Sequence, residues 1–152
     1  MTRILMVCLG NICRSPLAEG ILKSKVNNTT VFVDSAGTGA WHSGELPDKR
    51  SIAIAKKYGI DLTDQRARLF LVEDFDRFDK IYVMDKSNYV NVCRLAPNNA
   101  AVEKVELILN ESQSGKDLEV PDPYYGGDQG FENVYQMLNE ACEKIKDKLE
   151  NL

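Results

Sequence analysis

The fold of this chain is decided by a stretch near its start, Cys8-Leu9-Gly10-Asn11-Ile12-Cys13-Arg14-Ser15. A short apolar run, Arg3-Ile4-Leu5-Met6-Val7, comes just before it and predicts a buried strand. Pro16 follows it and suits the first position of a helix, with Ser15 expected as the N-cap. The stretch is therefore expected to form a turn between a strand and a helix.

The residue types in this turn favour the binding of an anion. Backbone N–H groups of the turn and the positive end of the helix would converge on one point. Arg14 can add a bidentate fork onto two oxygens of a tetrahedral oxyanion. The same positive field favours the thiolate form of Cys8, which is the reactive form. We therefore expect residues 9–15 to bind phosphate beside a nucleophilic Cys8.

A second motif, Asp122-Pro123-Tyr124-Tyr125, lies far along the chain. In this order, the two motifs resemble the phosphate loop and the general-acid loop of the low-molecular-weight protein tyrosine phosphatases. The resemblance runs from Ile4 to the C-terminal helix. It implies a phosphoric monoester hydrolase that acts on phosphotyrosine in proteins through a cysteinyl-phosphate intermediate.

Length and composition are those of an ordinary globular protein. The 152 residues predict one domain, residues 1–152, and 43 % of them are hydrophobic and 28 % charged. No run approaches the roughly 18 apolar residues that a membrane span needs, and no signal peptide is evident, so a cytoplasmic location is expected. A net charge of −4 argues against nucleic acid and anionic membranes as partners.

Strand-like and helix-like segments alternate along the chain. Such alternation predicts an α/β fold of three layers, a four-stranded parallel sheet of order 2-1-3-4 with helices on both faces. The exit of the second strand, residues 34–39, is expected to be a loop. Cys8 follows the first, central strand, at the edge of the sheet where ligands of such folds bind. The expected strands are residues 3–7, 30–33, 80–84 and 105–109, and the expected later helices are residues 48–58, 72–78, 85–96 and 131–149.

Three residues are assigned to catalysis. Cys8 would attack phosphorus, and Arg14 with the loop N–H groups would hold the phosphoryl oxygens. Asp122 stands between two prolines that stiffen its loop, and the resemblance implies that it is the general acid and then the base. His42, the only histidine, is an alternative acid.

Other residues are expected to support the loop or to line the pocket. Asn11 tolerates left-handed backbone geometry and would organise the loop with Ser35, while Ser15 would donate its hydroxyl to the Cys8 sulfur. Trp41 either stacks on a substrate ring or packs on the domain surface. Lys49 would favour acidic residues that flank the substrate. The remaining pocket candidates are Ile12 and, by the resemblance, Tyr124 and Tyr125.

The cysteines bear on redox chemistry and on rival functions. The resemblance implies a reversible Cys8–Cys13 disulfide that protects against over-oxidation. An arsenate reductase would need two further cysteines on a mobile segment, and Cys93 has no neighbouring cysteine. A protein-arginine phosphatase of the same family is expected to carry threonine at the position of Ile12. A phosphate-binding module without activity would not need Cys8, Arg14 and Asp122 together.

The composition also limits cofactors and partners. With a single histidine and no short cysteine spacing, no zinc site is expected, and no cofactor of any kind. The expected partners are proteins that contain phosphotyrosine, together with inorganic phosphate as product and competitive ligand. The chain is expected to be a monomer.

Overall fold

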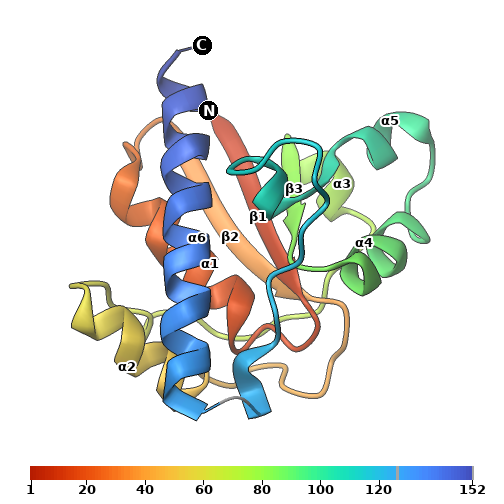
Figure 1. The fold of residues 1–152 in the computed structure, drawn as a ribbon. Coiled ribbons are helices and arrows are strands. Elements are labelled where there is room, and N and C mark those ends of the chain that lie inside the picture. Colours follow the sequence, from red (N-terminus) through yellow and green to blue (C-terminus); the bar gives the residue numbers. More distant parts are fainter. Residues whose placement is uncertain (126, 152) are drawn as a thin grey trace.

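A four-stranded parallel sheet lies at the centre of the computed structural model, which describes residues 1–125 and 127–151 but not the side chain of Tyr125 (Figure 1). The strand order is β2-β1-β3-β4, and each neighbouring pair is parallel, which confirms the predicted order. The strands are β1 (Thr2–Cys8), β2 (Val31–Gly37), β3 (Lys80–Val83) and β4 (Val105–Leu107).

Helices cover both faces of this sheet. One core contains side chains of α1 (Arg14–Lys25), α2 (Lys49–Lys57) and α6 (Gly127–Glu150), with Ile4 and Met6 of β1. The other contains side chains of α3 (Asp74–Arg77), α4 (Lys86–Cys93) and α5 (Asn99–Glu103), with Leu5 and Val7. Successive residues of β1 thus face opposite layers, which is why its sequence is a continuous apolar run.

The predicted boundaries of the second and fourth strands are wrong. Residues 34–37 were expected to be a loop, but they continue β2 and pair with β1 as far as Cys8 opposite Gly37. The fourth strand stops at Leu107, where a 3₁₀ turn over Ile108–Asn110 begins. Strand pairing with the long central β1 overrides the loop-forming residue types of 34–37.

One helix was not predicted, and another starts earlier than expected. The unpredicted helix is α5, whose start is capped by Asn98 through a bond from the Ala101 N–H. Ser15 is not the cap of α1, because that helix already begins at Arg14. Its hydroxyl lies instead against the side chains of Cys8 and Asn11.

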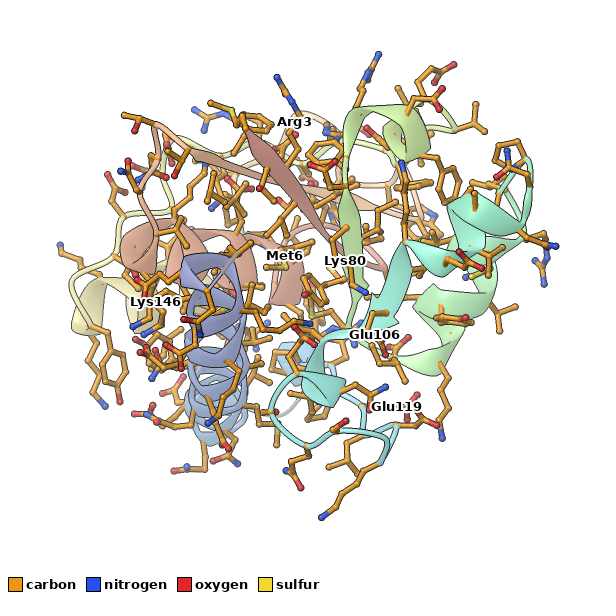
Figure 2. All side chains as sticks on the ribbon, turned by 90° about the horizontal axis from the view of Figure 1, so that it is seen from above. Arg3, Met6, Lys80, Glu106, Glu119 and Lys146 are labelled. Carbon is orange, nitrogen blue, oxygen red and sulfur yellow. The ribbon has the colours of Figure 1, made fainter. Side chains whose placement is uncertain are left out.

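The two ends of the sheet have different roles. The carboxyl ends of β1, β2 and β3 meet at one edge, and the loops after them carry the candidate site. The start of β1 and the end of α6 lie together at the opposite end (Figure 1). Seen from that end in Figure 2, Arg3 and Lys80 mark the starts of β1 and β3, and Lys146 marks the last turns of α6. Over the described residues, no helix has the length and apolar character to cross a membrane.

Candidate active site

The loop after β1 forms the floor of a cavity of about 260 Å³. Cys8, Ile12 and Arg14 line it from the loop, and Asp122 reaches it from the segment before α6. The structure thus brings together residues that lie more than a hundred positions apart in the sequence. The other lining residues are Leu9, Gly10, Cys13, Trp41, His42 and Tyr124.

The Asn11 side chain holds the loop in place through three hydrogen bonds. Its backbone has φ 56°, the left-handed region that asparagine tolerates, and its side chain is buried. Its amide nitrogen donates to the hydroxyls of Ser15 at 2.8 Å and Ser35 at 3.0 Å. Its amide oxygen accepts the backbone N–H of Arg68 at 3.0 Å. The asparagine side chain therefore joins the loop to α1, to β2 and to the segment before α3.

The Asn11 amide donates to both serine hydroxyls, so each serine oxygen acts as an acceptor in that bond. Ser15 accepts from Asn11, so its own hydrogen is available to the Cys8 sulfur, 3.0 Å away. Ser35 likewise accepts from Asn11 and donates to Glu19 at 2.6 Å. Burial raises the pKa of Glu19, although bonds from Lys23 and Ser35 favour its charged form. The single hydroxyl hydrogen of Ser15 therefore has two acceptors in reach, the Cys8 sulfur and, at 3.5 Å, the Ala36 carbonyl.

A glycine at the end of β2 allows the loop to pass close by. A Cβ atom on Gly37 would lie 2.9 Å from the Leu9 carbonyl oxygen and 3.0 Å from the Asn11 nitrogen. Both of these are backbone atoms, which cannot rotate away. The two residues after β2 also bind the loop, because the N–H groups of Thr38 and Gly39 donate to the Cys8 and Leu9 carbonyls.

Arg14 is buried and oriented by two acceptors. Its Nη1 donates to Asp85 at 2.7 Å and to the Val120 carbonyl at 2.9 Å. Its Nη2 lies 3.9 Å from the Asp122 carboxylate. Burial opposes its charge, but Cys8 and Asp85 outweigh this effect and raise the pKa of Arg14. Both hydrogens of Nη1 are thus engaged, and the edge formed by Nε and Nη2 remains for a ligand.

Asp85 was not among the predicted site residues. It follows β3 after Met84, and its other oxygen accepts the Asn88 N–H at the start of α4. An acidic residue at the carboxyl end of a strand next to β1 was the available signal, because the ends of parallel strands meet at one edge. The Val120 carbonyl left no such signal, since its role belongs to the backbone.

Cys13 lines the cavity but is buried. Burial, followed by the charges of Asp48 and Cys8, raises the pKa of Cys13 to about 12. Near neutral pH it is therefore a thiol and a poor nucleophile. Cys93 and Cys142 do not line this cavity.

Asp122 and two aromatic residues form the opposite rim. The Asp122 Oδ1 accepts the N–H of Tyr124 at 3.0 Å, and the carboxylate faces the cavity from an exposed segment. Trp41 lies against Gly39, where a Cβ atom would come within 1.9 Å of the indole ring, yet 72 % of Trp41 is exposed. Trp41 thus packs on its own loop and lines the cavity, and its stacking on a substrate ring stays a prediction.

The remaining candidates lie beside or outside this rim. His42 lines the cavity, and its Nδ1 is hydrogen-bonded to the Glu45 carboxylate. Lys49 lies in a separate groove between α2 and α6, not in the cavity. The side chain of Tyr125 falls outside the described residues. Over the part of the chain that the structure describes, His, Cys, Asp and Glu side chains form no group of three that could hold a metal ion.

The whole chain resembles a known family of enzymes. A family model described as low molecular weight phosphotyrosine protein phosphatase matches residues 3–151. The relative of that name from Schizosaccharomyces pombe is 43 % identical over 148 residues, covering 94 % of each chain.

Two solved structures of related proteins have folds similar to that of this chain. A protein tyrosine phosphatase from Entamoeba histolytica, with Hepes in the active site, has a TM-score of 0.91 and 37 % identity, covering 99 % of this chain and 98 % of its own. A Drosophila arginine phosphatase has a TM-score of 0.88 and 33 % identity, covering 98 % of each chain.

Proposed function

Because the chain belongs to the low molecular weight phosphotyrosine protein phosphatase family of hydrolases, we propose that it hydrolyses phosphotyrosine in proteins through a cysteinyl-phosphate intermediate. The observation that carries the proposal is a single cavity that contains the Cys8 sulfur, the Arg14 guanidinium and the Asp122 carboxylate. Three groups of this kind are what an in-line phosphoryl transfer requires: a nucleophile, an oxyanion binder and a proton donor.

In the first step, the Cys8 thiolate attacks phosphorus. A sulfur–phosphorus bond forms while the bond from phosphorus to the tyrosine oxygen breaks. The Ser15 hydroxyl donates to the sulfur and stabilises the thiolate before the attack. In the second step, the same donor stabilises the thiolate as it leaves.

Arg14 and the loop N–H groups hold the three equatorial oxygens of the phosphoryl group. Asp85 and the Val120 carbonyl engage Nη1 and so aim the edge formed by Nε and Nη2 at the cavity. Such preorganised donors stabilise the transition state because they do not have to reorient as charge moves. Inorganic phosphate, the product, would bind the same cradle and compete with substrate.

Asp122 gives its proton to the departing phenolate oxygen. A phenolate is a poor leaving group, so this proton lowers the barrier. The deprotonated carboxylate then takes a proton from the water that attacks the cysteinyl-phosphate. Hydrolysis of the sulfur–phosphorus bond returns Cys8 as a thiolate and releases phosphate.

The walls of the cavity favour an aromatic substrate. Ile12 is an apolar contact for a ring, and Trp41 and Tyr124 are aromatic. The Cys8 sulfur lies at a buried position on the floor, so a long phenyl phosphate reaches it better than a short phosphoserine. The likeness to the Drosophila arginine phosphatase makes phosphoarginine the second candidate, which Ile12 disfavours because a guanidinium prefers a polar wall.

The test is hydrolysis of matched peptides that carry phosphotyrosine, phosphoserine or phosphoarginine. We expect phosphate release from the phosphotyrosine peptide, and a phosphorylated Cys8 in acid-quenched samples examined by mass spectrometry. Cys93→Ser is the matched control, because Cys93 lies outside the cavity. Preferential release from phosphoarginine would overturn the substrate assignment, and a phosphoryl group on another residue would overturn the mechanism.

A further inference from the structure

The first turn of α2 is bonded directly to the phosphate loop. The N–H of Asp48, the residue that caps this helix, donates to the Ile12 carbonyl at 2.7 Å. The buried Ser51 hydroxyl donates to the Cys13 carbonyl at 3.2 Å. The start of α2 therefore has a fixed position relative to the phosphate cradle.

Arg50 extends from this turn towards the opposite rim. Its guanidinium is held by the Asp48 carboxylate through Nε at 3.1 Å and Nη2 at 3.2 Å. The same group lies over two aromatic rings, 5.1 Å from the centroid of Tyr124 and 4.6 Å from that of Phe131. Both distances are within the range of cation–π attraction.

Tyr124 connects Arg50 to Asp122. Its N–H donates to the Asp122 Oδ1 at 3.0 Å, and Pro123 between them fixes the backbone. The Asp122 Oδ2 lies 3.9 Å from Arg14, too far for a hydrogen bond, and the side chain is nearly half exposed. The position of the Asp122 carboxylate thus depends on the turn from Asp122 to Tyr124 and on the contacts that position Tyr124.

We propose that Arg50 is a positioning residue that holds Tyr124, and through it Asp122, at a set place opposite the phosphate loop. The inference rests on the proposed function, because it requires Asp122 to act as the proton donor. A planar guanidinium can stack on both rings while binding Asp48, whereas a lysine ammonium is a compact point charge without such a plane. Arg50 itself does not line the catalytic cavity.

The test compares Arg50→Ala, Arg50→Lys and the control Lys57→Ala. Lys57 is a cation of the same helix, but it contacts Tyr58 and Glu132 instead of Tyr124. We expect Arg50→Ala to slow hydrolysis of a phosphotyrosine peptide by up to about 10²-fold, the cost of a small misplacement. p-Nitrophenyl phosphate, whose phenol leaves without a proton, should slow far less, and inhibition by phosphate should be unchanged. Arg50→Lys should fall between, and Lys57→Ala should match the parent.

A double variant separates positioning from a general loss of structure. In an Asp122→Asn background, Arg50→Ala should cause no further loss on the phosphotyrosine peptide, because the group it positions is already disabled. Equal slowing of both substrates, or full additivity in the double variant, would overturn the proposal. If Arg50→Ala does not fold, Arg50→Lys and its double variant give the same comparison.

The same measurements distinguish this inference from the proposed function. If the parent protein does not hydrolyse the phosphotyrosine peptide, or Asp122→Asn does not slow it, the proposed function fails and the inference fails with it. If the parent is active, Asp122→Asn shows the expected loss and Arg50→Ala does not, only the inference is overturned.

Discussion

The phosphate loop and the rim opposite it belong to one pocket, but they are built in different ways. In the loop, Asn11, Arg14 and Ser15 are at most 3 % exposed, and each is held by buried hydrogen bonds. On the rim, 40 % of Tyr124 and 72 % of Trp41 are exposed. The loop is thus fixed by its interior partners, whereas the rim is held by a few contacts at the surface.

The difference between loop and rim corresponds to two tasks of the site, which are binding the phosphoryl group and receiving the peptide around it. A cradle for a phosphoryl group gains from rigidity, because its donors must already point at the developing charge. A rim that receives different peptides tolerates side chains with fewer constraints. Changes in the loop should therefore damage both catalysis and stability, and changes in the rim should act on catalysis or substrate preference alone.

The largest effect is expected for Cys8→Ser. Turnover should fall by at least about 10⁴-fold, since the nucleophile is lost. Affinity for inorganic phosphate should persist, because Arg14 and the backbone N–H groups supply the cradle. Phosphate binding measured by calorimetry, beside a steady-state assay, checks both parts. Substantial turnover in this variant would remove Cys8 as the nucleophile.

Mild peroxide should abolish the phosphatase activity completely but reversibly, through the phosphate loop. Peroxide oxidises Cys8 to a sulfenic acid, and the Cys13 thiolate then attacks that sulfur and displaces hydroxide to form the disulfide. Because the pKa of Cys13 is about 12, the closing step should accelerate about tenfold for each unit of pH between 7 and 9. Quenched samples examined by mass spectrometry report the closure. A disulfide that excludes Cys13, or a loss of activity that a thiol does not reverse, would contradict this.

Arg14→Lys should cost about 10³-fold in kcat/KM, because a point charge reproduces neither the fork nor its two anchors. Phosphate inhibition should weaken as well, which distinguishes this variant from Cys8→Ser. Lys25→Arg is the control, because this cation at the far end of α1 pairs with Glu143 of α6 and does not line the cavity. A near-normal rate with near-normal phosphate affinity would show that the bidentate role is wrong.

Asp122→Asn tests the rim. Hydrolysis of phosphotyrosine should slow by about 10²-fold or more, and less for aryl phosphates with acidic phenols. The free energy of unfolding should barely change, as the side chain is nearly half exposed. Uniform slowing across leaving groups would make His42 the next residue to test.

Asn11→Gly is expected to have the smallest kinetic effect and the clearest effect on stability. Glycine keeps the positive φ but leaves two hydroxyls and one N–H without the asparagine partner, so the free energy of unfolding should fall by about 1–3 kcal/mol. The rate should fall about tenfold as the loop loosens. Trp41→Ala is the matched rim variant and should leave the denaturation midpoint unchanged. Equal midpoints for the two variants would contradict the division between loop and rim.

How much of this could be predicted from the sequence depends on the range of the contacts. The turn that joins Cys8 to Arg14 is local, so its residue types and the apolar run before it indicated the turn and the central strand. The strand order followed from general rules of parallel sheets and is confirmed.

The parts that sequence reasoning missed depend on tertiary contacts. Asp85 reaches Arg14 from the start of α4, and the Val120 carbonyl reaches it from the segment before Asp122. The Arg68 N–H reaches Asn11 from a segment without regular structure. Ser15 was expected to cap a helix because serine favours that position. The structure places its hydroxyl beside the Cys8 sulfur, the second role expected for this residue, and begins the helix one residue earlier at Arg14.

The placement of the two chain ends has a practical consequence. The start of β1 and the end of α6 lie together at one end of the molecule (Figure 1), whereas the residues that line the pocket follow the opposite, carboxyl ends of the strands. A label, a surface tether or a fused recruitment module at either end would therefore leave the pocket clear. Immobilised protein should hydrolyse small and large substrates in the same ratio as free protein, so that single-molecule or chip-based assays report the undisturbed enzyme.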